Sequence, residues 1–172
     1  MEESAARPLG DLDRVRRRVL WSLPAGLYLL GAADGERRNL MTLSWATQLA
    51  TQPKLLGVGV EAGALTHALV REGGAFSLSV LHRHDRAIVR RFVKPAEDDP
   101  EAGTLGGQRV LTASTGAPIL AGAAAWLDCE LRHVLELGSH TLFVGEVIDC
   151  DLPGGEEITP LRMEDTRMSY GG

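Results

Sequence analysis

Two long strand-forming segments, residues 123–137 and 140–152, are separated only by Gly138 and Ser139. A two-residue connection is too short for a crossover, so the two segments must pair as antiparallel neighbours. This hairpin predicts an antiparallel sheet as the centre of the fold.

The other strand signals are short and alternate with short helices. Residues 26–45 predict two strands joined by a turn at Asp34-Gly35-Glu36-Arg37. Further strands are expected at 55–61, 75–81, 108–113 and 117–121, and short helices at 11–22, 64–74 and 84–92. Repeated βα units are absent, which argues against a doubly wound sheet. A closed or nearly closed antiparallel β-barrel with helical caps fits best, since closure removes exposed sheet edges.

Composition restricts the class of protein. The 172 residues, of which 44% are hydrophobic and 24% charged, predict one globular domain spanning 1–172, with a tail at 153–172 whose end we expect to fray. A net charge of −5 argues against nucleic acid as the main partner, and 5% aromatic residues are too few for a base-stacking platform. No apolar run reaches the length of a membrane span, so no membrane contact is expected.

Two features bear on location. Arg16-Arg17-Arg18 before VLWSLPAGLYLLGAA resembles a signal peptide, but Asp11 and Asp13 dilute the charge and Pro24 interrupts the apolar run. A short helix followed by a strand is the better interpretation. Cys129 and Cys150 lie in apolar, strand-like runs without a paired-cysteine motif, which predicts two buried, reduced thiols in a cytoplasmic protein.

The sequence lacks a dinucleotide fingerprint, a phosphate loop, a zinc hydrolase motif and a nucleophile elbow. His82 and His84 are close together, but no third ligand follows from the spacing, so no metal site is expected. His140 follows the Gly138-Ser139 turn and precedes an apolar strand, so its ring can point into a rim. A plain surface position is the alternative for this histidine.

The segment Asn39–Pro53, NLMTLSWATQLATQP, places uncharged hydrogen-bonding side chains among apolar residues. A flat heterocycle needs such a setting, with neutral donors and acceptors at its edge and apolar packing on its faces. Thr42, Ser44 and Thr47 are the candidates. Hydroxyls satisfied within ordinary strands are the simpler alternative, and the residues alone leave it open.

The segment GALTHA, residues 63–68, opens a predicted short helix. A phosphate on the same ligand could be held there by the Thr66 hydroxyl, by His67 as a cationic partner and by the free N–H groups of the first helical turn. The alternative for Thr66 is a helix-cap hydroxyl.

From about Leu23 to Leu152 the chain resembles the flavin reductase-like family, whose members bind FMN in a split β-barrel. The resemblance lies in the order of several motifs. They are an apolar strand after Pro24, then Asn39, Met41-Thr42, Ser44, Thr47 and Pro53, the runs LLGVGVE, ALTHALVREGG and AFSLSVL, Arg91-Phe92, and the turn Gly138-Ser139-His140.

The resemblance implies an antiparallel FMN-binding split barrel and a homodimer with each flavin near the subunit interface. It implies that residues from Met41 to Thr47 line the flavin ring, that residues 62–67 contact the phosphate, that Arg91 lies near the flavin, and that His140 serves nicotinamide binding. The predicted cofactor-binding residues are therefore Asn39, Met41, Thr42, Leu43, Ser44, Trp45, Thr47, Ala62, Gly63, Ala64, Leu65, Thr66, His67 and Arg91.

Three positions depart from the family pattern. Ala64 stands where many relatives have serine, Trp45 is bulkier than usual, and Ser139 replaces an aspartate. We expect an FMN-binding oxidoreductase that transfers hydride from NAD(P)H to flavin, with a monooxygenase or another acceptor taking the electrons. A flavin- or haem-binding carrier, store or sensor without catalytic activity is the alternative.

Overall fold

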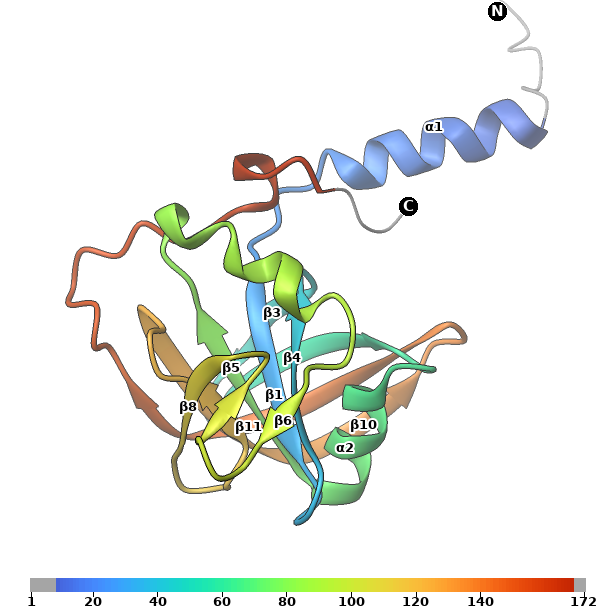
Figure 1. The fold of residues 1–172 in the computed structure, drawn as a ribbon. Helices are drawn as coiled ribbons and strands as arrows, with labels where there is room; N and C mark the ends of the chain where they lie inside the picture. Colours follow the sequence, from blue (N-terminus) through green and yellow to red (C-terminus); the bar gives the residue numbers. More distant parts are fainter. Residues whose placement is uncertain (1–8, 169–172) are drawn as a thin grey trace, which may run out of the picture.

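The computed structural model describes residues 9–168, and it consists of antiparallel strands surrounded by short helices (Figure 1). Residues 1–8 and 169–172, which include the terminal Tyr170-Gly171-Gly172, lie outside the described residues. The elements are α1 (Leu9–Trp21), β1 (Tyr28–Ala33), β2 (Arg38–Leu43), β3 (Ala46–Thr51), β4 (Lys54–Glu61), α2 (Leu65–Gly73), β5 (Ala75–Val80), the 3-10 helices η1 (Arg83–Asp85) and η2 (Ile88–Phe92), β6 (Asp98–Asp99), β7 (Thr104–Leu105), β8 (Gln108–Thr112), β9 (Pro118–Leu120), β10 (Ala125–Glu136), β11 (His140–Asp151) and the 3-10 helix η3 (Met163–Asp165).

The predicted long hairpin is formed by β10 and β11, which pair along nearly their whole length. Gly138 makes the turn with a φ of +86°, a conformation that L side chains rarely adopt. The Leu137 N–H closes the turn by donating to the His140 carbonyl at 2.8 Å. Two register shifts along the pair are bulges, which bend the hairpin and increase its twist.

The main sheet has seven strands in the order β2-β1-β5-β10-β11-β4-β3. Every neighbouring pair is antiparallel. β2 and β3 lie at opposite ends of this order, yet only Ser44 and Trp45 separate them along the chain. The sheet must therefore curl until its two edges meet, which produces a barrel split between β2 and β3. The predicted antiparallel split barrel with short helices is confirmed.

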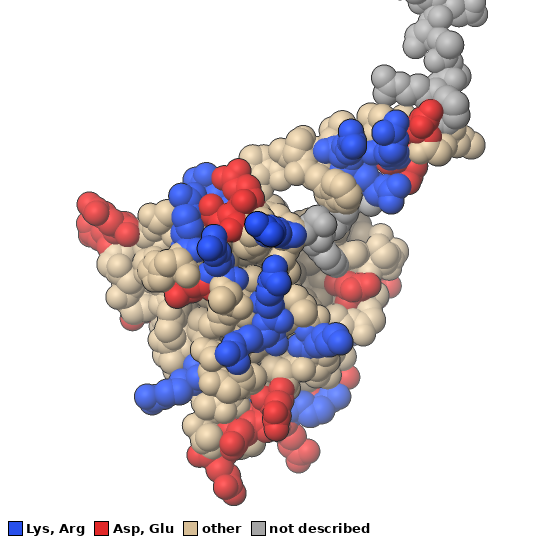
Figure 2. All heavy atoms as spheres, turned by 45° about the horizontal axis from the view of Figure 1, so that its top comes forward, with Lys and Arg blue, Asp and Glu red and all other residues tan. Residues whose placement is uncertain are grey.

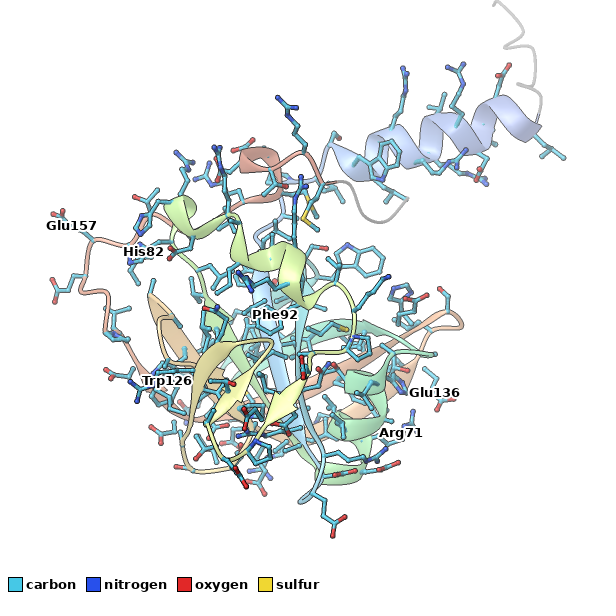
Figure 3. All side chains as sticks on the ribbon, viewed as in Figure 1. Arg71, His82, Phe92, Trp126, Glu136 and Glu157 are labelled. Atoms are coloured by element: carbon cyan, nitrogen blue, oxygen red, sulfur yellow. The ribbon has the colours of Figure 1, made fainter. Side chains whose placement is uncertain are left out.

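Two apolar clusters fill the interior. One includes Phe143 on β11 and Leu69 of α2, a helix that packs against β1 and β2. The other includes Phe92, at the end of η2, and Leu161 from the C-terminal segment. Phe92 has no exposed surface and lies at the front of the barrel in Figure 3. α2 and η2 thus cover the barrel with apolar side chains.

A second sheet, in the order β6-β7-β8-β9, lies against the barrel. Its strand β9 crosses β1 so closely that a Cβ atom at Gly31 would lie 1.9 Å from the Pro118 carbonyl oxygen. Ser77 donates a hydrogen bond of 2.6 Å to the same oxygen. Gly31 is therefore required for the contact between the two sheets.

Three local predictions were wrong. The segment 84–92, expected to form one short helix, forms two separate 3-10 helices. Asp98, expected in a solvated acidic loop, lies in β6 and accepts hydrogen bonds from Arg38 Nε at 2.9 Å and Nη2 at 2.8 Å. Cys150 is exposed, because it lies near the end of the long hairpin beyond the core, whereas Cys129 is buried.

The two ends of the described chain behave differently. α1 projects away from the barrel, and none of its residues is buried (Figure 1). The C-terminal segment returns to the barrel: Met163 N–H donates to the Ala25 carbonyl at 2.9 Å, and Leu27 N–H to the Leu161 carbonyl at 3.0 Å. The predicted fraying concerns the end of the tail, which lies outside the described residues. Among residues 9–168, no helix has the length and apolar character needed to cross a membrane.

Candidate functional site

A cavity of about 310 Å³ lies beside the split between β2 and β3. The split leaves the end of β2 without a hydrogen-bonded neighbour on one side, so the chain there can line an opening. Other walls come from β4, from the segment after η2 and from the returning C-terminal segment. The lining residues are Leu27, Met41, Thr42, Leu43, Ser44, Gly59, Glu61, Val93, Met163 and Met168.

Ser44, one of the lining residues, has the most informative side chain at this cavity. The side chain is buried, and its Oγ is the only buried side-chain nitrogen or oxygen in the described part of the chain without a hydrogen-bond partner. Leaving a buried hydroxyl unsatisfied destabilises a protein by about 1–3 kcal/mol. A ligand that offers a polar ring edge at this position would remove that penalty.

The walls around Ser44 are mainly apolar. The thioethers of Met41, Met163 and Met168 are flexible and polarisable, so they adapt well to the faces of a flat ring. Thr42 also lines the cavity, but its hydroxyl already donates to the Val89 carbonyl at 2.6 Å and ties β2 to η2. The cavity therefore fits a planar, largely apolar group with a few polar edge atoms.

Trp45 and His140 come together beside this cavity, although 94 residues separate them along the chain. Their ring centroids are 4.7 Å apart, with an interplanar angle of 48°. Gly59 makes this possible, because a Cβ there would lie 3.3 Å from the Trp45 ring. The group that approaches the backbone closely at Gly59 is therefore Trp45.

His140 is the first residue of β11, and it lies directly opposite Glu61 of β4 in the strand register. Opposed residues of an antiparallel pair share one face of the sheet. The Ser139 hydroxyl lies 3.0 Å from His140 Nδ1, so the serine that replaces the aspartate of the pattern still contacts the imidazole. Imidazole, indole and carboxylate side chains therefore gather at one rim of the cavity.

Asn39 is a buried structural connector. Its Nδ2 donates to Thr66 Oγ1 at 2.9 Å, and its Oδ1 accepts from the Ala96 N–H at 2.9 Å. Thr66 has no exposed surface. Its hydroxyl therefore holds α2 against β2, and its contact with a phosphate stays a prediction.

His67 is also held in the interior. Its Nε2 lies 2.8 Å from the Thr141 hydroxyl, and its ring packs 5.0 Å from that of Phe143. Burial is the main cause that lowers the pKa of His67, with the nearby Arg71 guanidinium adding to the effect. Arg71 itself donates to Glu136 at 2.8 Å, and both are labelled in Figure 3. A neutral imidazole gives a phosphate less support than the predicted cation.

The loop before α2 remains open. Ala62 and Gly63 are exposed, and no side chain caps the N-terminus of the helix. The first helical N–H groups carry partial positive charge and suit an anion. Ala62 N–H donates to the Ser139 carbonyl at 3.0 Å, so this loop is joined to the His140 turn.

Basic side chains gather on the face that carries η1 and η2 (Figure 2). Arg90, Arg91 and Lys94 are exposed there, beside Val93 of the cavity wall. The predicted site residue Arg91 thus lies near the opening. In the range 9–168, no group of three His, Cys, Asp or Glu side chains could hold a metal ion.

The structure brings some predicted residues together and separates others. Met41, Thr42, Leu43 and Ser44 line the cavity, whereas the exposed Thr47 does not. The other lining residues of the cavity were not predicted from the sequence: Leu27, Gly59, Glu61, Val93, Met163 and Met168. The apolar residues of the tail gave no signal that they would return to a site more than a hundred residues away in the sequence.

The sequence profile described as "Flavin reductase like domain" matches residues 20–172. A relative named diflavin flavoprotein A 1, from Synechocystis, is 27% identical over 92% of this chain. This chain spans only 28% of that relative's length. An NADH-dependent FAD reductase from Streptomyces globisporus is 32% identical over 79% of this chain and 75% of its own.

A solved structure gives the same result at the level of the fold. The styrene monooxygenase flavin reductase from Pseudomonas putida S12 is 29% identical and superposes with a TM-score of 0.70. The match covers 86% of this chain and 90% of that chain.

Proposed function

Because this chain belongs to the flavin reductase-like family, we propose that it binds FMN in the cavity beside Ser44 and oxidises NAD(P)H. The observation that carries the proposal is the Ser44 hydroxyl, which is buried at the cavity wall and lacks a partner. The bound flavin supplies the electron-accepting chemistry, and the protein supplies orientation, desolvation and hydrogen bonds.

The chain's own residues fit the faces and the edge of a flavin ring. Ser44 offers one donor and acceptor at the edge, and the thioethers of Met41 and Met163 offer adaptable packing. The same apolar walls exclude water from the ring. Thr42 acts indirectly, because its bond to Val89 fixes the end of β2.

The phosphate of the ligand is assigned to the loop of residues 62–65. Its support comes from exposed backbone at the uncapped N-terminus of α2. Thr66 and His67 would hold this helix in place from the interior. Arg91, exposed near the cavity, would add positive charge at longer range.

The reductant is assigned to the rim formed by His140, Trp45 and Glu61. The Ser139 hydroxyl lies 3.0 Å from His140 Nδ1 and would orient the imidazole at this rim. An amide such as nicotinamide offers both a donor and an acceptor to the polar side chains of this rim. Trp45 provides an aromatic surface beside it.

The remaining parts of the proposal rest on similarity to relatives. Reductase components such as the styrene monooxygenase flavin reductase suggest a monooxygenase as the electron acceptor of this chain. We also propose a single domain over residues 1–172, a homodimer and a cytoplasmic location.

The test is a visible absorption spectrum of the purified protein, followed by titration with FMN and an assay of NADH and NADPH oxidation. Uptake of FMN together with oxidation of either nucleotide is expected. Uptake of FMN without oxidation would identify a flavin carrier. A protein that ignores FMN, or that shows a haem Soret band, would refute the proposal.

A further inference from the structure

α1 presents an apolar stripe that has no counterpart in its own barrel. Leu12, Val15 and Val19 follow the i, i+3, i+7 spacing of one helical face, called here the arm face. None of the three is buried, and Val19 is 59% exposed. No other element of residues 9–168 packs extensively against the helix. A helix of 13 residues is only marginally stable alone in water, so its stability must come from packing.

The helix also differs in charge from the rest of the molecule. α1 contains four arginines and two aspartates, a net charge of +2, whereas residues 22–172 contain 13 basic and 19 acidic residues, a net charge of −6. Arg14 and Arg17 pair with aspartates within the helix, at 3.6 and 3.5 Å. The helix and the rest of the chain thus carry net charges of opposite sign.

The barrel carries an exposed apolar surface on the outside of β3, β4, β11 and β10. A Cβ at Gly57 would lie 2.7 Å from Leu49 and 3.2 Å from Leu142, so these two leucines meet over the glycine. Leu135 lies directly opposite Leu142 in the register, on the same face. Leu49 is 46% exposed and Leu135 54%. These three leucines are called the outer patch.

We infer that α1 is an exchanged arm, whose arm face packs on the outer patch of a second copy of this chain. Both surfaces are apolar, and the helix and the barrel have opposite net charges, so their contact is complementary. Within one copy, α1 projects away from the barrel (Figure 1), and none of its residues is buried. A two-fold dimer would form the contact twice and cover both arms and both patches.

In the proposed dimer, the exchanged arm would also affect the rim at His140. The outer patch lies on the same sheet face as Trp45, which covers the glycine two residues along β4 from Gly57. An arm from the second copy would therefore lie next to the rim at His140. The contact would help to exclude water from that rim.

Disulfide trapping tests the arm directly. In a Cys150→Ser background, Val19→Cys protein is mixed with Leu49→Cys protein and oxidised. Burial raises the pKa of the remaining Cys129 thiol to about 12, so this thiol stays protonated and unreactive. We expect a covalent dimer whose linked tryptic peptides contain positions 19 and 49. The matched control pairs Val19→Cys with Leu111→Cys, a residue of β8 that is 38% exposed, and should give no linked peptide.

Sedimentation and FMN titration separate the inference from the function. Serine at all three arm-face positions should raise the dimer dissociation constant at least about 100-fold, because several buried apolar side chains are lost at each arm. A dimer without the 19–49 link, or a dimer unchanged by the serines, would overturn the exchanged arm. A monomeric wild type would overturn the arm and the proposed dimer together, while unchanged FMN uptake would leave the flavin site standing.

Discussion

Replacement of Ser44 by alanine should change the stability of the ligand-free protein and its affinity for FMN in opposite directions. In the ligand-free protein the Ser44 hydroxyl is buried without a partner, so its removal takes away a desolvation penalty. In the proposed complex the same hydroxyl would donate to or accept from the flavin edge. Removal then eliminates a hydrogen bond.

The magnitudes follow from the burial of that atom. An unsatisfied buried hydroxyl destabilises by about 1–3 kcal/mol, and part of this is recovered in the variant, so ligand-free Ser44→Ala should be about 1 kcal/mol more stable. A neutral hydrogen bond contributes about 0.5–1.5 kcal/mol net, and 1.4 kcal/mol corresponds to a tenfold change in affinity. FMN affinity should therefore fall by about 3- to 20-fold, which includes the unsatisfied edge atom left on the ligand.

Ser79→Ala is the matched control. Ser79 is also fully buried, but its Oγ accepts a hydrogen bond from the Leu120 N–H at 3.1 Å. Its loss should destabilise the protein by about 1–3 kcal/mol and leave FMN affinity unchanged. Urea unfolding and FMN fluorescence titration measure the two quantities. A Ser44→Ala protein that is destabilised as much as the control and binds FMN normally would refute the reasoning.

Three further predictions follow from the interior contacts and the rim. Asn39→Ala leaves the Thr66 hydroxyl and the Ala96 N–H without their partner, so the free energy of unfolding in urea should fall by about 2–4 kcal/mol, and an unchanged value would contradict the connector role. Burial lowers the pKa of His67 below 6.5, so the unfolded chain takes up the proton at a higher pH than the folded protein does. The free energy of unfolding should therefore fall as the pH drops below about 6.5. Urea titrations at several pH values measure this dependence, which His67→Gln should flatten. His140→Ala should raise the KM for NAD(P)H about tenfold with FMN affinity unchanged, and steady-state kinetics showing a fall in kcat alone would contradict its assignment to the reductant side.

The fold was largely predictable because its strongest signals are local. The two-residue connection at Gly138-Ser139 allows only an antiparallel hairpin. Gly74, with a φ of +69°, ends α2 at the end of the helix predicted over 64–74. The two 3-10 helices within 83–92 were not predicted, since helical periodicity over nine residues does not distinguish a continuous α-helix from two shorter turns.

The candidate site was predictable only where it lies on one continuous segment. Met41, Thr42, Leu43 and Ser44 adjoin one another along the chain, and the cavity includes all four. A hydroxyl in a sequence does not reveal its partner, however. The Ser44 hydroxyl lacks a hydrogen-bond partner, whereas the Thr66 hydroxyl accepts from Asn39. This difference depends on tertiary contacts alone.

The other walls come from residues brought together by the closure of the barrel. Met163 reaches the cavity because its N–H pairs with the Ala25 carbonyl, on the opposite end of the chain. Glu61 meets His140 because β4 and β11 are neighbours in the curled sheet. Neither contact produces a periodic pattern or a characteristic spacing of residues in the sequence.

A β-bridge pairs Gly26 with Arg162, so the chain enters and leaves the barrel fold at two neighbouring points. A module whose ends adjoin can be spliced into a surface loop of another protein without stretching its host. Both joints would lie beside the cavity, because Leu27 and Met163 are among its walls. A short tether at either joint would therefore hold an attached redox protein near the cavity at a millimolar effective concentration, on the order of that found for short flexible linkers.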